Sequence, residues 1–260
     1  MLRIEKLPEY SEPSIRQPPA PRFDIRGRAI ELMKSPLLRT CLVLALGIHS
    51  SLAQQQVSPR PNPARLIEAI TAFAKQDTET GGIVFTGSSS IRRWPQLKES
   101  FPGLPVVNLG FGGSIANDLI VFFETIITRH EPKLVVIYTG GNDLNEKLSV
   151  EESVADYTKF LNMIHDRFPD TRVIITSVKI AQRRVLQIPS VHALNQQLEA
   201  WCSGKDWVRF VDCTTYLADS DGQPISSFYI EDHLHLSPEG YAKWTGILEP
   251  VLREEWEKVN

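Results

Sequence analysis

Four short segments of the chain combine glycine with side chains that can carry out acyl-transfer chemistry. In chain order they are Gly-Ser-Ser-Ser at 87–90, Gly-Phe-Gly-Gly at 110–113, Gly-Gly-Asn-Asp at 140–143 and Asp-His-Leu-His at 232–235. A serine hydroxyl becomes a nucleophile when a histidine accepts its proton, and a carboxylate can hold that histidine in the required tautomer. Glycine N–H groups and an asparagine amide can donate hydrogen bonds to the oxyanion that forms. Together the segments predict the site of a serine ester hydrolase.

Each segment alone has an ordinary structural explanation. Serine clusters after strands are often helix N-caps, and Gly-Gly-Asn-Asp is favourable turn sequence. The 110–114 segment fits a tight turn as well, but it fails as a dinucleotide loop because Ile115 stands where the third glycine is needed. Residues 87–91 also lack the final glycine of the nucleophile elbow of α/β-hydrolases. The prediction therefore depends on the four segments in combination.

The last segment offers two histidines for one role. Asp232 and His235 are three residues apart, a spacing that brings a carboxylate and an imidazole to one side of a turn. His233 is adjacent to Asp232 and would project elsewhere, so we expect His235 to be the general base. The isolated histidines are expected to be surface or packing residues; they are His130, His165 and His192.

The elements that must position these segments alternate between strands and helices. Apolar runs predict strands at 83–86, 106–109, 134–138, 173–176 and 208–211, and helical spacing of apolar residues predicts helices within 61–80, 115–129, 150–168, 191–201 and 238–256. Such alternation indicates a parallel sheet covered on both faces. We predict a three-layer α/β/α fold over 61–260, with the four segments in the crevice beyond the carboxyl ends of the strands.

The first 60 residues lack the alternating strand and helix pattern of the rest of the chain. Residues 1–32 are polar and rich in proline, without periodicity, and are expected to be disordered or to result from a start codon placed too far upstream. From Met33, a basic region with Lys34 and Arg39, the apolar run 41–48 and Ser-Leu-Ala at 51–53 predict a signal peptide, cleaved after Ala53. The protein is then exported, and 54–60 is a linker.

Composition limits the class of function. The chain has 260 residues, 42% hydrophobic and 23% charged, which suits one globular domain. Its formal charge of −3 excludes a broadly basic surface and disfavours nucleic-acid binding. Cleavage after residue 53 removes eight of 28 basic and five of 31 acidic side chains, so the mature charge is −6. It leaves Cys202 and Cys213, which could pair or remain free thiols.

Over residues 80–250, the four segments resemble in order and separation the sequence blocks of the SGNH hydrolases, the GDSL esterase/lipase superfamily. Gly-Ser-Ser-Ser-Ile-Arg at 87–92, Asn-Leu-Gly-Phe-Gly-Gly-Ser at 108–114 and Asp-x-x-His-Leu-x-x-x-Gly-Tyr at 232–241 are similar to secreted bacterial members described as lysophospholipase-like or platelet-activating-factor-acetylhydrolase-like. One departure is Ser88, which stands where the family name implies aspartate. That aspartate is not the triad acid, so the resemblance still implies an active site.

The resemblance implies a role for each matching residue. Ser89 is the expected nucleophile, His235 the base and Asp232 its orienting acid, with Gly113 and Asn142 as oxyanion donors beside the Ser89 N–H. A flavodoxin-like sheet of five strands is implied, with no cofactor and no metal.

The sequence does not select a substrate. A small ester, an acylated glycan or a lysolipid presents the same carbonyl. The 179–189 stretch, with Gln182, Arg183 and Arg184, is expected to be a solvated loop; the alternative is a border of the pocket that contacts an anionic group. The alternative function is a catalytically silent carbohydrate- or lipid-binding module on the same fold; a nucleotide-binding domain is disfavoured by the lack of a glycine-lysine phosphate loop. The oligomeric state stays open.

Overall fold

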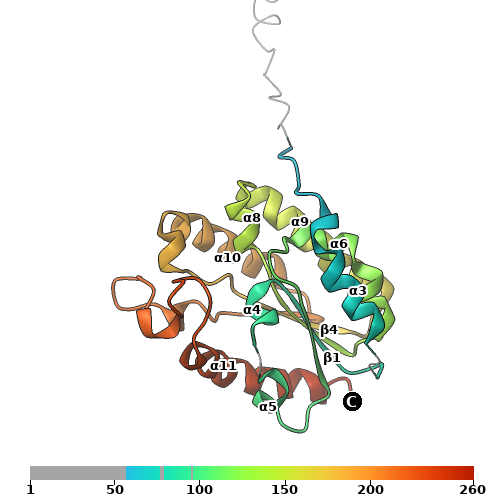
Figure 1. Ribbon diagram of the computed structural model, residues 1–260. Coiled ribbons are helices and arrows are strands. Elements are labelled where there is room, and N and C mark those ends of the chain that lie inside the picture. Colours follow the sequence, from blue (N-terminus) through green and yellow to red (C-terminus); the bar gives the residue numbers. More distant parts are fainter. Residues whose placement is uncertain (1–56, 77–78, 95) are drawn as a thin grey trace, which may run out of the picture. The chain divides into compact units, whose positions relative to one another are not determined.

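The computed structural model describes residues 57–76, 79–94 and 96–260 (Figure 1). The predicted signal peptide at 33–53, the segment 1–32 before it and linker residues 54–56 lie outside the described residues. The described chain from Val57 to Asn260 forms one compact unit. None of its described helices has the length and apolarity needed to span a bilayer.

A parallel sheet of five strands forms the middle layer. The strands lie in the order β2-β1-β3-β4-β5, and every pairing is parallel. Their bounds are β1 Ile83–Gly87, β2 Val106–Gly110, β3 Leu134–Tyr138, β4 Arg172–Thr176 and β5 Val208–Val211. The predicted three-layer α/β/α fold is confirmed, and each predicted strand lies within one residue of the observed one.

Helices cover both faces of this sheet (Figure 1). The α-helices are α3 Ile67–Lys75, α4 Ser89–Arg92, α5 Leu97–Ser100, α6 Ala116–Val121, α7 Phe123–Ile126, α8 Gly141–Asn145, α9 Val150–Arg167, α10 Ile188–Cys202 and α11 Pro238–Glu257. The 3-10 helices are η1 Pro63–Leu66, η2 Thr128–His130, η3 Gln182–Gln187, η4 Thr215–Leu217 and η5 Ser226–Phe228.

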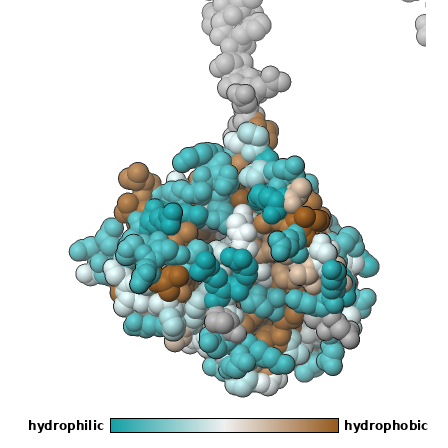
Figure 2. Space-filling view, in the orientation of Figure 1, coloured by the Kyte–Doolittle hydropathy of each residue, from teal (hydrophilic) through white to brown (hydrophobic). Residues whose placement is uncertain are grey.

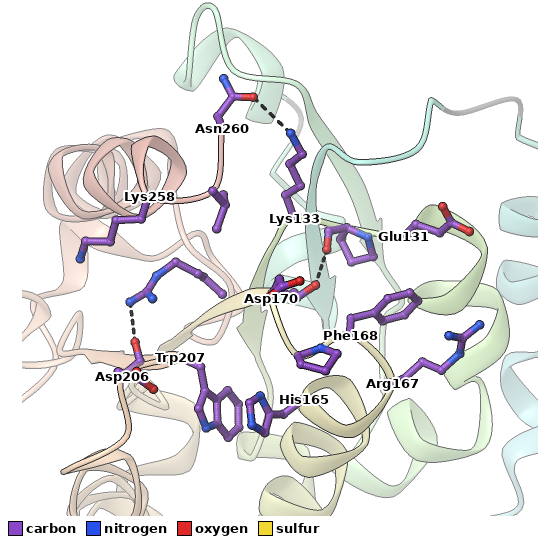
Figure 3. Close-up of a pocket in the computed structure, with 15 residues that line it drawn as sticks. Glu131, Lys133, His165, Arg167, Phe168, Asp170, Asp206, Trp207, Lys258 and Asn260 are labelled. Carbon is purple, nitrogen blue, oxygen red and sulfur yellow. Dashed lines mark hydrogen bonds between the residues drawn. The ribbon is translucent and has the colours of Figure 1, made fainter.

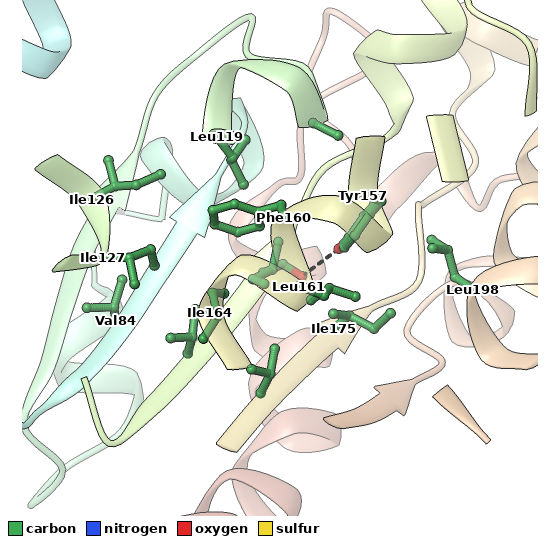
Figure 4. Packing of buried hydrophobic residues seen from close by; sticks show 14 of the residues in the cluster. Val84, Leu119, Ile126, Ile127, Tyr157, Phe160, Leu161, Ile164, Ile175 and Leu198 are labelled. Carbon is green, nitrogen blue, oxygen red and sulfur yellow. Dashed lines mark hydrogen bonds between the residues drawn. The ribbon is translucent and has the colours of Figure 1, made fainter. Parts of the chain in front are cut away.

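Alternate residues of each strand face opposite layers, and this separates the core into two clusters. Val84, Val135 and Ile175 point to the layer of α3, α6, α7, α9 and α10, where they meet Leu119 and Phe160 (Figure 4). The neighbouring strand residues point to the other layer, which α4, α5 and α11 form, and there they meet large aromatic rings; this second cluster includes Phe85, Val136, Trp94 and Trp244. Burial on both faces accounts for the nearly continuous apolar strand sequences.

One predicted helix is wrong. The 115–129 pattern forms α6, α7 and η2 instead of a single helix. The backbone leaves helical geometry at Phe122 (φ −101°, ψ 18°), and its ring packs edge to face on Phe111 with centroids 6.3 Å apart. Tertiary packing at this aromatic pair therefore breaks a segment whose apolar spacing suits a helix.

The two cysteines of the described chain do not pair. Cys202 ends α10 and Cys213 follows β5, and both are free and buried. Burial raises the pKa of the Cys202 thiol to about 12, so it stays protonated. The alternative of an internal disulfide, left open by the sequence, is not realised.

Candidate active site

The candidate residues gather at the carboxyl edge of the sheet. Ser89 follows β1, Gly113 follows β2 and Asn142 follows β3, and these three strands are neighbours with β1 in the middle. After β1 the chain forms β2 on one side of β1, and it then crosses over to form β3 on the other side of β1. Ligands of open α/β sheets bind at such a switch point.

The turn that carries Ser89 is held tightly against the sheet. Gly87 has φ +122°, and a Cβ there would lie 1.9 Å from the carbonyl oxygen of Tyr138, so only glycine fits. The Ser88 N–H donates to that same carbonyl at 2.9 Å. Ser88 and Ser90 are 5% and 2% exposed, whereas Ser89 is partly exposed. Among the three serines, Ser89 is therefore the one that a substrate can reach.

Ser89, His235 and Asp232 form one hydrogen-bonded line. His235 Nε2 lies 2.8 Å from Ser89 Oγ, and Nδ1 lies 2.5 Å from Asp232 Oδ2. An ionised carboxylate only accepts hydrogen bonds, so Nδ1 is the protonated nitrogen of the neutral ring. Nε2 is then the acceptor of the Ser89 hydroxyl proton. This is the tautomer that general-base catalysis by His235 requires.

The turn between Asp232 and His235 fixes the carboxylate. Its Oδ1 accepts the backbone N–H groups of Leu234 and His235 at 2.9 and 2.8 Å. Burial alone would raise the pKa of Asp232, but these bonds and the His235 side chain lower it far below its ordinary value. The pKa of His235 is lowered, mainly by burial and further by Arg93 and Lys179, although Asp232 opposes the shift. The pair is therefore a carboxylate and a neutral imidazole at neutral pH.

Lys179 lies buried beneath this turn. Its Nζ donates to the Leu234 carbonyl at 2.6 Å and lies 5.8 and 5.9 Å from the ring centroids of Tyr138 and Tyr229. Burial, aided by the charge of Arg184, lowers the pKa of Lys179 to about 7. The lysine ties the turn that bears Asp232 and His235 to the segment after β4.

The two candidate oxyanion donors are linked through one carbonyl. Asn142 Nδ2 donates to the carbonyl of Ser114 at 2.9 Å, and Ser114 follows Gly113 directly. Gly113 has φ +82°, a left-handed conformation that glycine adopts without strain. The other end of the Asn142 amide accepts a hydrogen bond from Arg184. Asn142 thus lies in a fixed orientation next to the Gly113 turn.

A buried acid joins the same two segments. Asp143 Oδ1 accepts the backbone N–H of Ala116 at 2.9 Å, which ties α8 to the start of α6. The side chain is fully buried, and this burial raises its pKa to about 7. Asp143 thereby helps to hold the neighbouring residue Asn142 in place. With a pKa of about 7, its buried carboxyl group is partly ionised at neutral pH.

Comparison with known proteins identifies the family. The model of the GDSL-like lipase/acylhydrolase family matches residues 70–243. The chain belongs to this family. No protein of curated function matches it.

Solved structures share the fold of this GDSL-like family member at low identity. A protein from Streptococcus pneumonia, provisionally assigned as a platelet activating factor, has a TM-score of 0.65 and 19% identity over 84% of this chain and 100% of its own. A provisionally assigned acylhydrolase from Bacteroides fragilis has 0.64 and 19%, over 75% and 99%. A GDSL-like lipase from Bacteroides thetaiotaomicron has 0.64 and 18%, over 74% and 99%.

The other histidines stand apart from this line. His233 is exposed, and its left-handed backbone (φ 55°) closes the turn while its carbonyl accepts the N–H of Arg183. His130 is buried, and the ring of His165 stacks on Trp207 with centroids 4.4 Å apart. Within the described residues, no group of three or more His, Cys, Asp or Glu side chains is arranged to hold a metal ion.

One cavity of this family member lies at the opposite edge of the sheet. Its volume is about 830 Å³, and its lining includes Lys133, Arg172 and Trp207, which lie at the amino ends of β3, β4 and β5 (Figure 3). A cavity of about 460 Å³ lies beside the turn at 232–235 and is lined by Arg183, Asp232 and His233 among others. The lining of the 830 Å³ cavity contains none of the candidate residues Ser89, Asn142, Asp232 and His235.

The surface around the site is mixed. The face shown in Figure 2 is mostly hydrophilic, with separate hydrophobic groups. Val185 and Leu186, on η3 beside Arg184, are 48% and 93% exposed. Lys179 and Asp143 lie in segments that the sequence singles out, at 179–189 and 140–143, but neither was given a role of its own, because neither has a motif spacing that links it to its partner.

Proposed function

We propose that this GDSL-like family member is a serine ester hydrolase that acts through Ser89, His235 and Asp232. The observation that carries the proposal is the hydrogen-bonded line from Ser89 Oγ through the His235 ring to Asp232. The family match and the partial exposure of Ser89 support it as well.

The reaction follows from the positions of the protons. Ser89 Oγ attacks the ester carbonyl carbon while His235 Nε2 takes the hydroxyl proton, and the carbonyl oxygen becomes an oxyanion. Hydrogen bonds from the N–H groups of Ser89 and Gly113 and from Asn142 Nδ2 stabilise that charge. When the intermediate collapses, Nε2 returns the proton to the leaving alcohol and an acyl-Ser89 remains. Water, deprotonated by the same nitrogen, then attacks the acyl carbon; the acyl–Oγ bond breaks, Nε2 returns the proton to Ser89 Oγ, and the carboxylic acid is released.

The three serines of one turn provide a matched test. We expect Ser89→Ala to lower kcat for p-nitrophenyl acetate by about 10⁴-fold or more, because the nucleophile is lost. Ser88→Ala and Ser90→Ala should retain substantial activity. Acid quenching of the wild type followed by peptide mass spectrometry should find the acyl group on Ser89. Full activity of Ser89→Ala, or loss only in Ser88→Ala, contradicts the assignment; ligand binding with no turnover in the wild type favours the silent binding module.

The substrate proposal is limited to carboxylic esters. Three solved structures with the same fold are named as a lipase, an acylhydrolase and a platelet activating factor protein. Some of these names refer to lipids, so lipid esters belong among the substrates to be tested. A screen should therefore compare p-nitrophenyl esters of increasing chain length with acetylated sugars and lysolipids. The class with the highest kcat/KM identifies the acyl and alcohol groups.

We also infer that the protein is exported. The support is the sequence of residues 33–53, with Lys34 and Arg39 before an apolar run and Ala53 at the cleavage position. The division into 1–32, a signal peptide, a linker at 54–60 and a domain at 61–260 stays a prediction. N-terminal sequencing of protein from the native cell should find Gln54; a product that begins at Met1 or Met33 contradicts the inference.

A further inference from the structure

Arg184 lies behind the Asn142 amide and contacts it directly. Its Nη2 donates to Asn142 Oδ1 at 3.0 Å, and its Nη1 donates to the Gly141 carbonyl at 2.7 Å. The planar fork of one guanidinium therefore holds two consecutive residues at the start of α8. Arg184 itself is half-buried, and its backbone leaves helical geometry within η3 (φ −123°, ψ 33°).

These contacts determine which way the amide points. An arginine only donates hydrogen bonds, so the atom of Asn142 that faces Arg184 must be the oxygen. Nδ2 then faces the opposite side, where one of its two N–H groups donates to the Ser114 carbonyl. The second N–H remains for an oxyanion. A flipped amide would place an NH₂ group against the guanidinium and an oxygen where the oxyanion forms.

The charge on Arg184 adds an electrostatic effect to this geometry. A hydrogen bond from a cation to the amide oxygen draws electron density away from Nδ2, which makes its N–H groups better donors. The positive charge also lies on the side of the amide remote from the developing negative charge, where it adds favourable potential without contact.

We propose that Arg184 is a positioning residue for the reaction, which fixes and polarises the Asn142 amide so that Nδ2 stabilises the oxyanion. The inference rests on the proposed function and extends it to a residue that does not touch the substrate. It differs from a role of Arg184 in binding an anionic substrate group, because two of its donors are already committed to the protein.

A double-mutant cycle tests the inference. In the purified protein with p-nitrophenyl acetate, we expect Asn142→Ala to lower kcat by about 10²–10³-fold and Arg184→Met by about 10²-fold, with KM little changed in both. In the Asn142→Ala background, Arg184→Met should change kcat less than about twofold, since the partner it acts on is gone. Arg184→Lys, which keeps the charge but not the fork, should fall between wild type and Arg184→Met.

The controls separate this role from others. Arg167→Met removes an exposed arginine at the opposite edge of the sheet and should leave kcat unchanged. Equal losses from Arg184→Met in both backgrounds, or a rise in KM alone, overturn the positioning role. A fully active Asn142→Ala variant overturns the oxyanion assignment and the positioning role together. If Arg184→Met does not fold, Arg184→Lys in both backgrounds gives the same comparison.

Discussion

Opposing influences act on the His235 imidazole. Burial and the positive charges of Arg93 and Lys179 lower its pKa, while the hydrogen bond and charge of Asp232 raise it. The balance leaves the pKa below its ordinary value, so the ring is neutral and able to accept the Ser89 proton at neutral pH. Positive charge around the base therefore keeps it available as pH falls.

This balance predicts a pH profile. The proposed base, His235, acts only when neutral, so kcat/KM should fall as pH decreases through a midpoint below 6.5, the ordinary value for histidine. Arg93→Gln removes one positive charge and should shift that midpoint to higher pH. The pKa of Lys179 is about 7, and its charge also lowers the pKa of His235. The pH profile of Lys179→Met should therefore be measured in parallel. Arg167→Gln, at the opposite edge, is the control. A profile that is flat from pH 5 to 8, or identical for Arg93→Gln, contradicts the prediction.

At the scale of elements, the sequence predicts what apolar periodicity controls. The central strands β1 and β3 are buried on both faces, so each is a short apolar run with clear ends. Ser89 and Asn142 were proposed from the sequence because glycines mark the ends of β1 and β3, and His235 because it lies three residues after Asp232. The short helix α8 and the turn η3 have no such pattern. The bond between Arg184 and Asn142 joins residues 42 positions apart, and only the fold brings them together.

The link between α8 and α6 predicts a pH-dependent stability. The pKa of Asp143 is 3.8 ordinarily and about 7 when folded, so the unfolded chain releases this proton first and stability decreases as pH rises between these values. Asp143→Asn cannot ionise and still accepts the Ala116 N–H. We expect urea unfolding at pH 8 to show Asp143→Asn more stable than wild type by on the order of 1–4 kcal/mol, with little difference at pH 4. The exposed Asp170→Asn should change neither value. Parallel curves for wild type and Asp143→Asn contradict the prediction.

At the scale of the whole molecule, the described chain begins with a segment that is bonded to the domain. Ser58 donates from its N–H and its hydroxyl to Glu152, at 2.6 and 2.9 Å. Arg60 forms ion pairs with Glu152 and Asp156 at 3.0 and 2.9 Å. All four side chains lie on or against α9, on the layer opposite α11. Ser58 and Arg60 fall within the predicted linker at 54–60, yet they are bonded to the surface of the domain.

A comparison of two start points measures what this segment contributes. A chain that begins at Pro61 loses the contacts of Ser58 and Arg60 with α9. Its free energy of unfolding should be about 1 kcal/mol lower than that of a chain that begins at Val57. Arg60→Met in the longer chain should reproduce part of the loss, and high salt should reduce the difference because the ion pairs are partly exposed. Activity should be equal in both chains, since the segment contacts α9 and not the Ser89 turn. Equal free energies of unfolding by urea would show that the segment does not stabilise the fold.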